Sequence, residues 1–252
     1  MKSSVLCPDL GRKGGKNMDE TKCAVCADEE IFTSELIDLE HTLAGKMLSQ
    51  CKHPWEALPK IKDCIMEIIE GLDKDRYVCL AEDVWAAKSA SIAPSALICG
   101  PTVIGENAEI RHCAYIRGSV LVGDGAVIGN SCELKNAIVS DGVQVPHYNY
   151  VGDSILGYKS HMGAGAVASN FRLDKKTINV RCGEEKISTG LRKMGVILGD
   201  FSEVGCNSVL YPGTVIGRRC LVYPLTGVRG TVGHDSIVKP DGKTLPRKTE
   251  NN

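Results

Sequence analysis

The fold is decided by residues 92–134, which read IAPSALICGPTVIGENAEIRHCAYIRGSVLVGDGAVIGNSCEL. An aliphatic residue recurs there at every sixth position: Ile92, Ile98, Ile104, Ile110, Ile116, Val122, Ile128 and Leu134. Four residues after each aliphatic residue stands a mostly small one: Ala96, Thr102, Ala108, Ala114, Val120, Ala126 and Cys132. Amphipathic strands repeat every two residues and would not fix two residue types at separate phases of a six-residue frame. The frame therefore predicts short strands joined at corners, three to a coil, with the aliphatic side chains inside.

The same frame continues toward the C-terminus. With two five-residue steps it runs through Val139, Val145, Val151, Leu156, Met162 and Ala168. It stops over 169–195 and resumes at Leu198, Val204, Leu210, Ile216, Val222 and Val228. We expect an all-β chain, a parallel β-helix of about seven coils over residues 81–240, with a loop excursion at 169–195.

Other patterns flank the frame. Residues 31–80 contain two amphipathic stretches, which predict a pair of helices that pack on the first coil or, alternatively, bind a partner. Residues 1–30 are expected to be a flexible leader and 241–252 a flexible tail. Cys23 and Cys26, with Cys51 and His53, could supply four zinc ligands. The second pair lacks the usual spacing, so we favour a metal-free segment.

Composition restricts the class of protein. The chain has 252 residues and a net charge of −1, which argues against a dedicated nucleic-acid surface. It has no apolar run of membrane-spanning length and no apolar segment typical of a secretory signal at its start. The twelve cysteines do not cluster, and Cys132 and Cys220 take the small-residue position of the frame. We therefore expect buried free thiols and a reducing, cytoplasmic location.

Two basic residues fall at one position of the frame. Arg117 and Lys135 each follow the corner aliphatic residue three repeats apart, so we expect them to be stacked one coil apart, within about 5 Å. Gly152 comes next in this stack, with Tyr150 close by. Like charges held so close favour an anionic guest such as a phosphate. Solvated surface charges are the alternative.

Residues 111–170 carry a resemblance to a known family. The segments IRG, GNSCELKNA, VPHYNYVGDSILG and MGAGAVASN resemble the acetyltransferase half of bifunctional N-acetylglucosamine-1-phosphate uridyltransferases. The later ISTGLRKMGVILGDFSEVGCNSVLYPGTVIG is similar to archaeal-type sugar-1-phosphate nucleotidylyltransferase/acetyltransferases. The resemblance implies a left-handed coil, a homotrimer, acetyl-CoA as co-substrate and a sugar phosphate as acceptor.

The resemblance also implies roles for individual residues. His147 takes the place of the family's general base, and the backbone N–H of Ala164 that of a donor to the acyl oxygen. The positions that bind the sugar phosphate are Arg117, Lys135, Tyr150, Asn170 and His161, the last standing where the family has Asn. The positions along the CoA path are Ala164, Cys206 and Pro224.

Several departures keep other functions open. Phe171 replaces a family Tyr, and Tyr223-Pro224-Leu225 replaces small residues of the CoA groove. The excursion is rich in Lys and Arg, which either clamp a CoA or sugar phosphate or are simply solvated. We expect an acyl-CoA-dependent acyltransferase. Three alternatives are a non-catalytic sugar-phosphate-binding scaffold, a γ-class carbonic anhydrase and a sugar nucleotidyltransferase.

The last two alternatives meet specific objections. His112 and His147 share a frame position two coils apart, about 10 Å, too far for one metal ion within a protomer. A nucleotidyltransferase domain does not fit into the roughly 80 residues that precede the frame.

Overall fold

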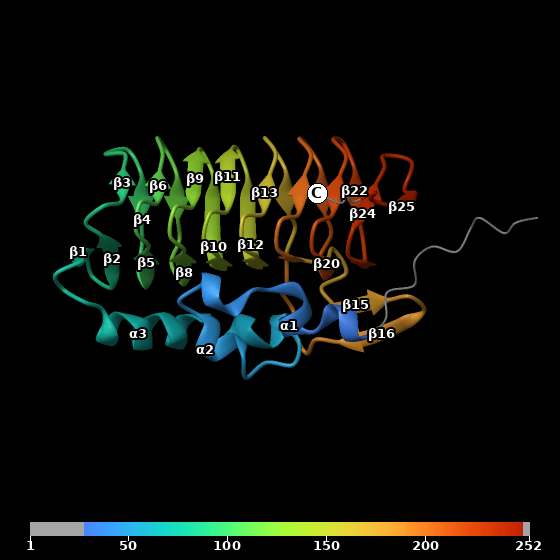
Figure 1. The fold of residues 1–252 in the computed structure, drawn as a ribbon, viewed down its shortest axis with the longest axis horizontal. Coiled ribbons are helices and arrows are strands. Elements are labelled where there is room, and N and C mark those ends of the chain that lie inside the picture. Colours follow the sequence, from blue (N-terminus) through green and yellow to red (C-terminus); the bar gives the residue numbers. More distant parts are fainter. Residues whose placement is uncertain (1–27, 249–252) are drawn as a thin grey trace, which may run out of the picture.

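The computed structural model describes residues 28–248, in which a long parallel β-solenoid carries a layer of helices along one side (Figure 1). The expected leader lies almost wholly outside these residues, as do Cys23 and Cys26 of the considered zinc site. None of the helices in residues 28–248 is both long enough and apolar enough to cross a membrane.

The solenoid has three faces, here called I, II and III. Face I consists of β3 (Ser91–Ile92), β6 (Glu109–Ile110), β9 (Val127–Asn130), β11 (Gln144–His147), β13 (His161–Met162), β18 (Glu203–Val204), β21 (Leu221–Val222) and β24 (Ser236–Val238). Face II consists of β4 (Leu97–Ile98), β7 (Tyr115–Ile116), the first halves of β10 (Glu133–Val139) and β12 (Tyr150–Leu156), then β14 (Val167–Ala168), β19 (Val209–Leu210) and β22 (Gly227–Val228). Face III consists of β2 (Val84–Ala87), β5 (Thr102–Ile104), β8 (Val120–Val122), the second halves of β10 and β12, then β17 (Val196–Leu198), β20 (Thr214–Ile216) and β23 (Thr231–Val232).

The sequence frame is confirmed, but its length was underestimated. The aliphatic residues of the frame lie in one continuous core inside the solenoid, and Cys132 and Cys220 are buried there as free thiols. The solenoid has about nine turns rather than about seven. It already begins at β2, before Ile92, and the coils continue in register across the excursion, because β12 pairs directly with β17.

The two five-residue steps of the frame have a structural cause. In β10 and β12 the strand passes from face II to face III through a single residue in the left-handed region, Asn136 (φ 49°) and Asp153 (φ 48°). Asn and Asp adopt this conformation more readily than other residues with a side chain. The shortened corners place these two polar side chains next to each other on adjacent coils.

Face III is covered by the rest of the chain. The side chains that its strands point outward are apolar and buried: Val103, Leu121, Ile138, Ile155, Ile197 and Val215. Helix α3 (Ile61–Gly71) contacts β5, β8 and β10, and the 3-10 helix η3 (Pro54–Lys60) contacts β12. The helical region therefore packs on the first coils, as expected, but also extends along the side of several further coils. The reason is the apolar outer row of face III, which must be buried.

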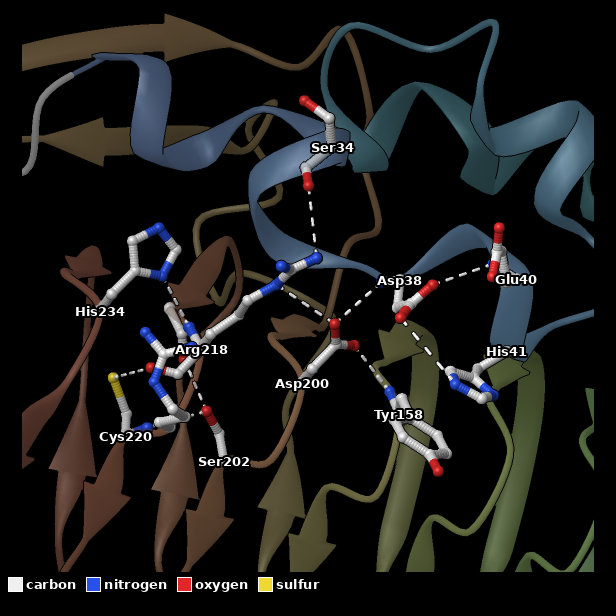
Figure 2. A network of polar contacts seen from close by, with 12 residues as sticks. Ser34, Asp38, Glu40, His41, Tyr158, Asp200, Ser202, Arg218, Cys220 and His234 are labelled. Atoms are coloured by element: carbon white, nitrogen blue, oxygen red, sulfur yellow. Dashed lines mark hydrogen bonds and ion pairs between the residues drawn. The ribbon is translucent and has the colours of Figure 1, made fainter. Parts of the chain in front are cut away.

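Short elements precede α3. They are η1 (Asp28–Ile31), α1 (Thr33–Leu36), η2 (Leu39–His41) and α2 (Gly45–Leu48). Asp200, buried on the solenoid, fastens this segment: its Oδ2 accepts the Asp38 N–H at 2.8 Å and its Oδ1 accepts the Tyr158 N–H at 2.8 Å (Figure 2). Arg218 forms an ion pair with Asp200 at 3.2 Å and donates to Ser34 O at 3.3 Å. Burial raises the pKa of Asp200 to about 6.

The excursion and the two ends complete the fold. The chain leaves the solenoid after β14, forms a hairpin of β15 (Asn179–Cys182) and β16 (Glu185–Ser188), and returns at β17. At the N-terminal end β1 (Tyr77–Ala81) pairs antiparallel with β2. At the C-terminal end β25 (Thr244–Pro246) pairs antiparallel with β24, within the segment expected to be a flexible tail.

Candidate active site

Faces I and II meet along an edge that we call corner A, defined by one residue of each successive coil: His112, Asn130, His147, Ala164, Cys206 and Pro224. Each of the first five accepts, through its carbonyl oxygen, a backbone N–H from the next coil; for example, Gly165 donates to His147 at 3.0 Å and Asn207 donates to Ala164 at 2.8 Å. The residue after each corner position has a positive φ, as in Tyr148 (53°) and Gly165 (70°). The expected spacing of His112 and His147, two coils apart, is thus confirmed.

The two histidines of corner A differ in their surroundings. Both ring nitrogens of His112 have partners: Nδ1 lies 2.6 Å from Ser95 Oγ and Nε2 lies 3.2 Å from Cys113 Sγ. The imidazole of His147 is exposed and has no hydrogen-bond partner among residues 28–248. His147 therefore has a ring nitrogen available for an external proton.

Ala164, one coil from His147, offers a second unused group. Its carbonyl accepts the Asn207 N–H, but its own N–H meets no acceptor within the described part of the chain. A half-exposed N–H of this kind can donate to an oxygen of a bound molecule.

Asn149 joins these two turns from the inside. It is buried, and its Oδ1 accepts the His147 N–H at 3.1 Å. Its Nδ2 donates to Gly163 O at 2.8 Å and to Ala166 O at 3.0 Å. Sequence reasoning missed Asn149, although it stands at the frame position that other coils give to a small residue.

A polar cluster lies at the opposite edge of face II, where face II meets face III, around the buried carboxylate of Asp153. Lys135 Nζ lies 3.3 Å from Asp153 Oδ1, and Asn136 Nδ2 donates to the same oxygen at 3.0 Å. Asn170 Nδ2 donates to Asp153 Oδ2 at 2.5 Å and to the Tyr150 hydroxyl at 3.1 Å. Burial raises the pKa of Tyr150, so this hydroxyl stays protonated at neutral pH. Three of the expected acceptor-binding residues are therefore brought together by an aspartate that the sequence analysis had given no role.

The stacking of Arg117 and Lys135 is confirmed, because Leu134 pairs with Ile116 and Lys135 pairs with Gly152. Both positive charges of this stack are paired with carboxylates, however. Arg117 forms an ion pair with Glu133 at 2.8 Å, which raises the pKa of the guanidinium, and Lys135 has Asp153. The like charges of this stack therefore do not by themselves favour an anionic guest. Binding of a phosphate here would have to compete with, or add to, the two carboxylates.

His161 lies apart from this cluster. It is on β13 of face I, where it pairs with Gln144 and Glu203, whereas Lys135 and Tyr150 are on face II. Within one chain, the edge at corner A separates His161 from the other expected acceptor-binding residues.

Cys206 and Pro224 continue corner A beyond Ala164, as the expected CoA path requires. Both are exposed, and their neighbours Tyr223 and Leu225 are exposed as well, Leu225 at 74%. The bulk of Tyr223 and Leu225 narrows any path along this part of the corner. In residues 28–248 no three histidine, cysteine or acidic side chains are grouped as metal ligands.

The chain is similar in sequence to several known proteins. The family described as the GMPPB C-terminal domain matches residues 98–187. A bifunctional sugar-1-phosphate nucleotidylyltransferase/acetyltransferase of Sulfurisphaera tokodaii is 34% identical over 174 residues, covering 62% of this chain. The match spans only 43% of that relative's length.

A second relative is matched over most of its length. The uncharacterized acetyltransferase YaiX of Escherichia coli O6:K15:H31 is 30% identical over 194 residues, which cover 68% of this chain and 80% of the relative. Among solved structures, the acetyltransferase domain of PglB from Neisseria gonorrhoeae, in complex with acetyl coenzyme A, is 17% identical with a TM-score of 0.34. That alignment covers 65% of this chain and 57% of the PglB chain, a likeness too low to bear on the site.

Proposed function

Because the chain belongs to the hexapeptide-repeat acetyltransferases, we propose that it transfers an acetyl group from acetyl-CoA to the amine of a phosphorylated amino sugar, such as glucosamine 1-phosphate. The observation that carries this proposal is corner A, which sets the free imidazole of His147 one coil from the free N–H of Ala164. A base and an oxyanion donor at this spacing are what acyl transfer to an amine requires.

The proposed reaction assigns one task to each group. Neutral His147 takes a proton from the sugar amine as the amine nitrogen bonds to the thioester carbonyl carbon. The Ala164 N–H donates to the oxygen that becomes negative in the tetrahedral intermediate. When the C–S bond breaks, the amide product forms, and the proton held by His147 goes to the departing thiolate. Lys135, Tyr150 and Asn170 hold the acceptor, while Cys206 and Pro224 border the acyl-CoA.

The substitution His147→Ala tests the proposal. We expect acetyl transfer to an amino-sugar phosphate to fall about 10² to 10⁴-fold, since a positioned base contributes that much. Acetyl-CoA binding and melting temperature should stay unchanged, because the imidazole is exposed and forms no hydrogen bond or ion pair with any residue in 28–248. His112→Ala, in the same column two coils away, is the matched control and should retain turnover. Activity of His147→Ala within threefold of the unsubstituted chain would remove His147 from the mechanism.

We also propose that the chain acts as a homotrimer. His161 on face I and the Lys135–Tyr150 cluster on face II cannot meet within one chain, but cyclic symmetry brings face I of one protomer toward face II of the next. Face III is already covered by the helical layer, so faces I and II remain available. Light scattering at micromolar concentration should give three times the mass of the chain, and a monomeric mass would contradict it.

One observation favours a second function, a sugar-phosphate-binding protein without transferase activity. Tyr223 and Leu225 stand beside the corner where a pantetheine arm would run. Calorimetric titration with CoA separates the two functions: binding supports the transferase, and sugar-phosphate binding without CoA binding supports the scaffold.

A further inference from the structure

A pocket of about 460 Å³ opens between the excursion and face II, on the coils beyond Tyr150. Phe171 and Leu173 of the excursion form one wall, and Val209 and Tyr211 of face II form the other. Its volume lies in the range of sites that take small molecules. None of the individual residues that the resemblance assigns to the acceptor or to CoA lines this pocket, although Arg172 and Arg181 belong to the basic excursion that was considered as a clamp for CoA or a sugar phosphate.

Three arginines from separate segments line the pocket. Arg172 is paired with Asp174 through two hydrogen bonds of 2.8 and 2.6 Å, which hold the pKa of Asp174 well below its usual range. Arg181 of β15 and Arg229 after β22 have no ion pair with any residue in 28–248. The pocket therefore contains two uncompensated guanidinium groups, and such groups bind phosphate oxygens in a bidentate manner.

The positions of these arginines are built into the fold. The guanidinium carbon of Arg229 lies 4.7 Å from the centroid of the Tyr211 ring, which supports it from one side. The hairpin segment that contains Arg181 lies close to the solenoid at the corner glycines Gly213 and Gly230. A Cβ on Gly213 would come within 2.7 Å of Ile178 Cγ2, and its φ of +80° would strain a residue with a side chain. A side chain at this corner would therefore force the hairpin or the corner to shift.

The apolar part of the pocket indicates what the anion is attached to. Leu173 is 99% exposed, and Phe171, Val209 and Tyr211 are each about two-fifths exposed. Aromatic and aliphatic surfaces of this kind favour a flat ring over bulk water. Arginines that can bind phosphates beside a surface that can bind a flat ring fit a nucleotide.

The pocket lies on the same column as the expected acceptor site. Lys135, Gly152, Ser169, Tyr211 and Arg229 follow one another at one position of face II, coil by coil. Tyr211 is three coils from Lys135, about 14 Å. Corner A, where acyl-CoA would lie, is separated from Tyr211 by the turn at Asn207 and by the strand β19. A ligand held at Lys135 can thus reach the pocket by extending straight along the column.

We propose that this pocket binds a nucleoside diphosphate, and hence that the phosphate of the amino sugar is part of a nucleotide, which narrows the proposed acceptor from glucosamine 1-phosphate to a nucleotide-linked amino sugar. The link between the amino sugar and the nucleotide rests on the proposed function, whereas binding of a nucleoside diphosphate in the pocket does not. Arg181 and Arg229 bind the diphosphate, and the base lies against Phe171 and Leu173. The net positive charge of the excursion, which has seven basic and three acidic side chains at 171–195, attracts the ligand.

Calorimetric titration of the full chain with UDP and with GDP tests the pocket without requiring turnover. We expect UDP or GDP to bind to the unsubstituted chain. Arg229→Ala should weaken this binding at least tenfold, since one charge-assisted contact is worth about 1.5 to 3 kcal/mol. Lys186→Ala is the matched control, because Lys186 pairs with Arg181 across the hairpin but does not line the pocket. It should change affinity less than twofold. CoA affinity should be the same in all three proteins.

Three results would overturn the inference. In the first, neither UDP nor GDP binds. In the second, Lys186→Ala weakens binding as much as Arg229→Ala, which means that only the diffuse charge of the excursion acts. In the third, CoA displaces UDP and Arg229→Ala weakens CoA equally, which assigns the pocket to CoA. His147-dependent transfer to glucosamine 1-phosphate without nucleotide binding would leave the proposed function intact and remove only the pocket.

Discussion

Asn149 holds together the two groups that the proposed reaction needs. It is the buried link between the turn of His147 and the turn that presents the Ala164 N–H. In the neighbouring coils the same position carries Cys132, Ala166 and Ser208. A larger polar side chain is accommodated in this narrow place because both polar atoms of its amide group have hydrogen-bond partners.

Replacing Asn149 with Ala should therefore lower the free energy of unfolding by about 1 to 3 kcal/mol, the usual cost of leaving buried polar groups unsatisfied. Turnover should fall as well, because the turns of His147 and Ala164 lose their common support. Ser208→Ala, at the same position of a coil beyond the site, loses only a contact to Tyr223 O and one from the Thr226 N–H. Chemical denaturation of both variants checks this. Equal losses, with turnover unchanged in Asn149→Ala, would contradict a positioning role.

For individual residues, the sequence predicted part of the site. The six-residue frame was sufficient to stack Lys135 on Arg117 and to place His147 two coils from His112. It could not predict which carboxylates would pair with the cations, because Glu133 and Asp153 reach them through side-chain conformations that spacing does not determine. The two five-residue steps did mark the corner where Asn136 and Asp153 meet, a signal that was present but not used.

Among the elements, face III differs from its neighbours. Its strands are apolar on both sides, as in TVI at 102–104, VLV at 120–122 and VIL at 196–198. A strand whose outer side chains are also aliphatic indicates a second buried layer. This pattern could have predicted the location of the helices, which the amphipathic stretches alone assigned to the first coil.

Ile155→Ala should cost about 2 to 5 kcal/mol of unfolding free energy, because Ile155 is fully buried between β12 and the helical layer. Leu97→Ala is its counterpart on face II, an outward strand residue that is 58% exposed. We expect a change below about 0.5 kcal/mol for Leu97→Ala. Urea denaturation of the two variants measures the difference. Similar values would mean that the helical layer does not contribute to stability as a packed core does.

For the whole molecule, Asp200 makes stability depend on pH. Its folded-state pKa of about 6 lies above the value of about 3.9 for an unfolded Asp, so the folded chain binds the proton more tightly. The resulting stabilisation is complete below pH 4 and is lost as the pH rises through 6. It amounts to about 3 kcal/mol at most.

We expect the unfolding free energy of the chain, measured relative to Asp200→Asn, to rise as the pH is lowered from 7.5 to 4. Asp235 provides a control of opposite sign, because two hydrogen bonds from Arg219 lower its pKa. Relative to Asp235→Asn, the chain should keep its stability down to about pH 4 and lose it only as the pH falls further, through the lowered pKa of Asp235. Denaturation curves at several pH values would show both slopes, and a flat difference for Asp200→Asn would rule out its contribution.

The solenoid ends on strands that run against its own direction. Every coil inside it offers backbone groups to a parallel neighbour, so an open last coil would accept a coil from another molecule. At one end β1 reverses direction on β2, and at the other β25 reverses on β24 and contains Pro246, which has no N–H to donate. At each end, the edge of one of the three faces is thereby closed to a further parallel strand: face III by β1 and face I by β25.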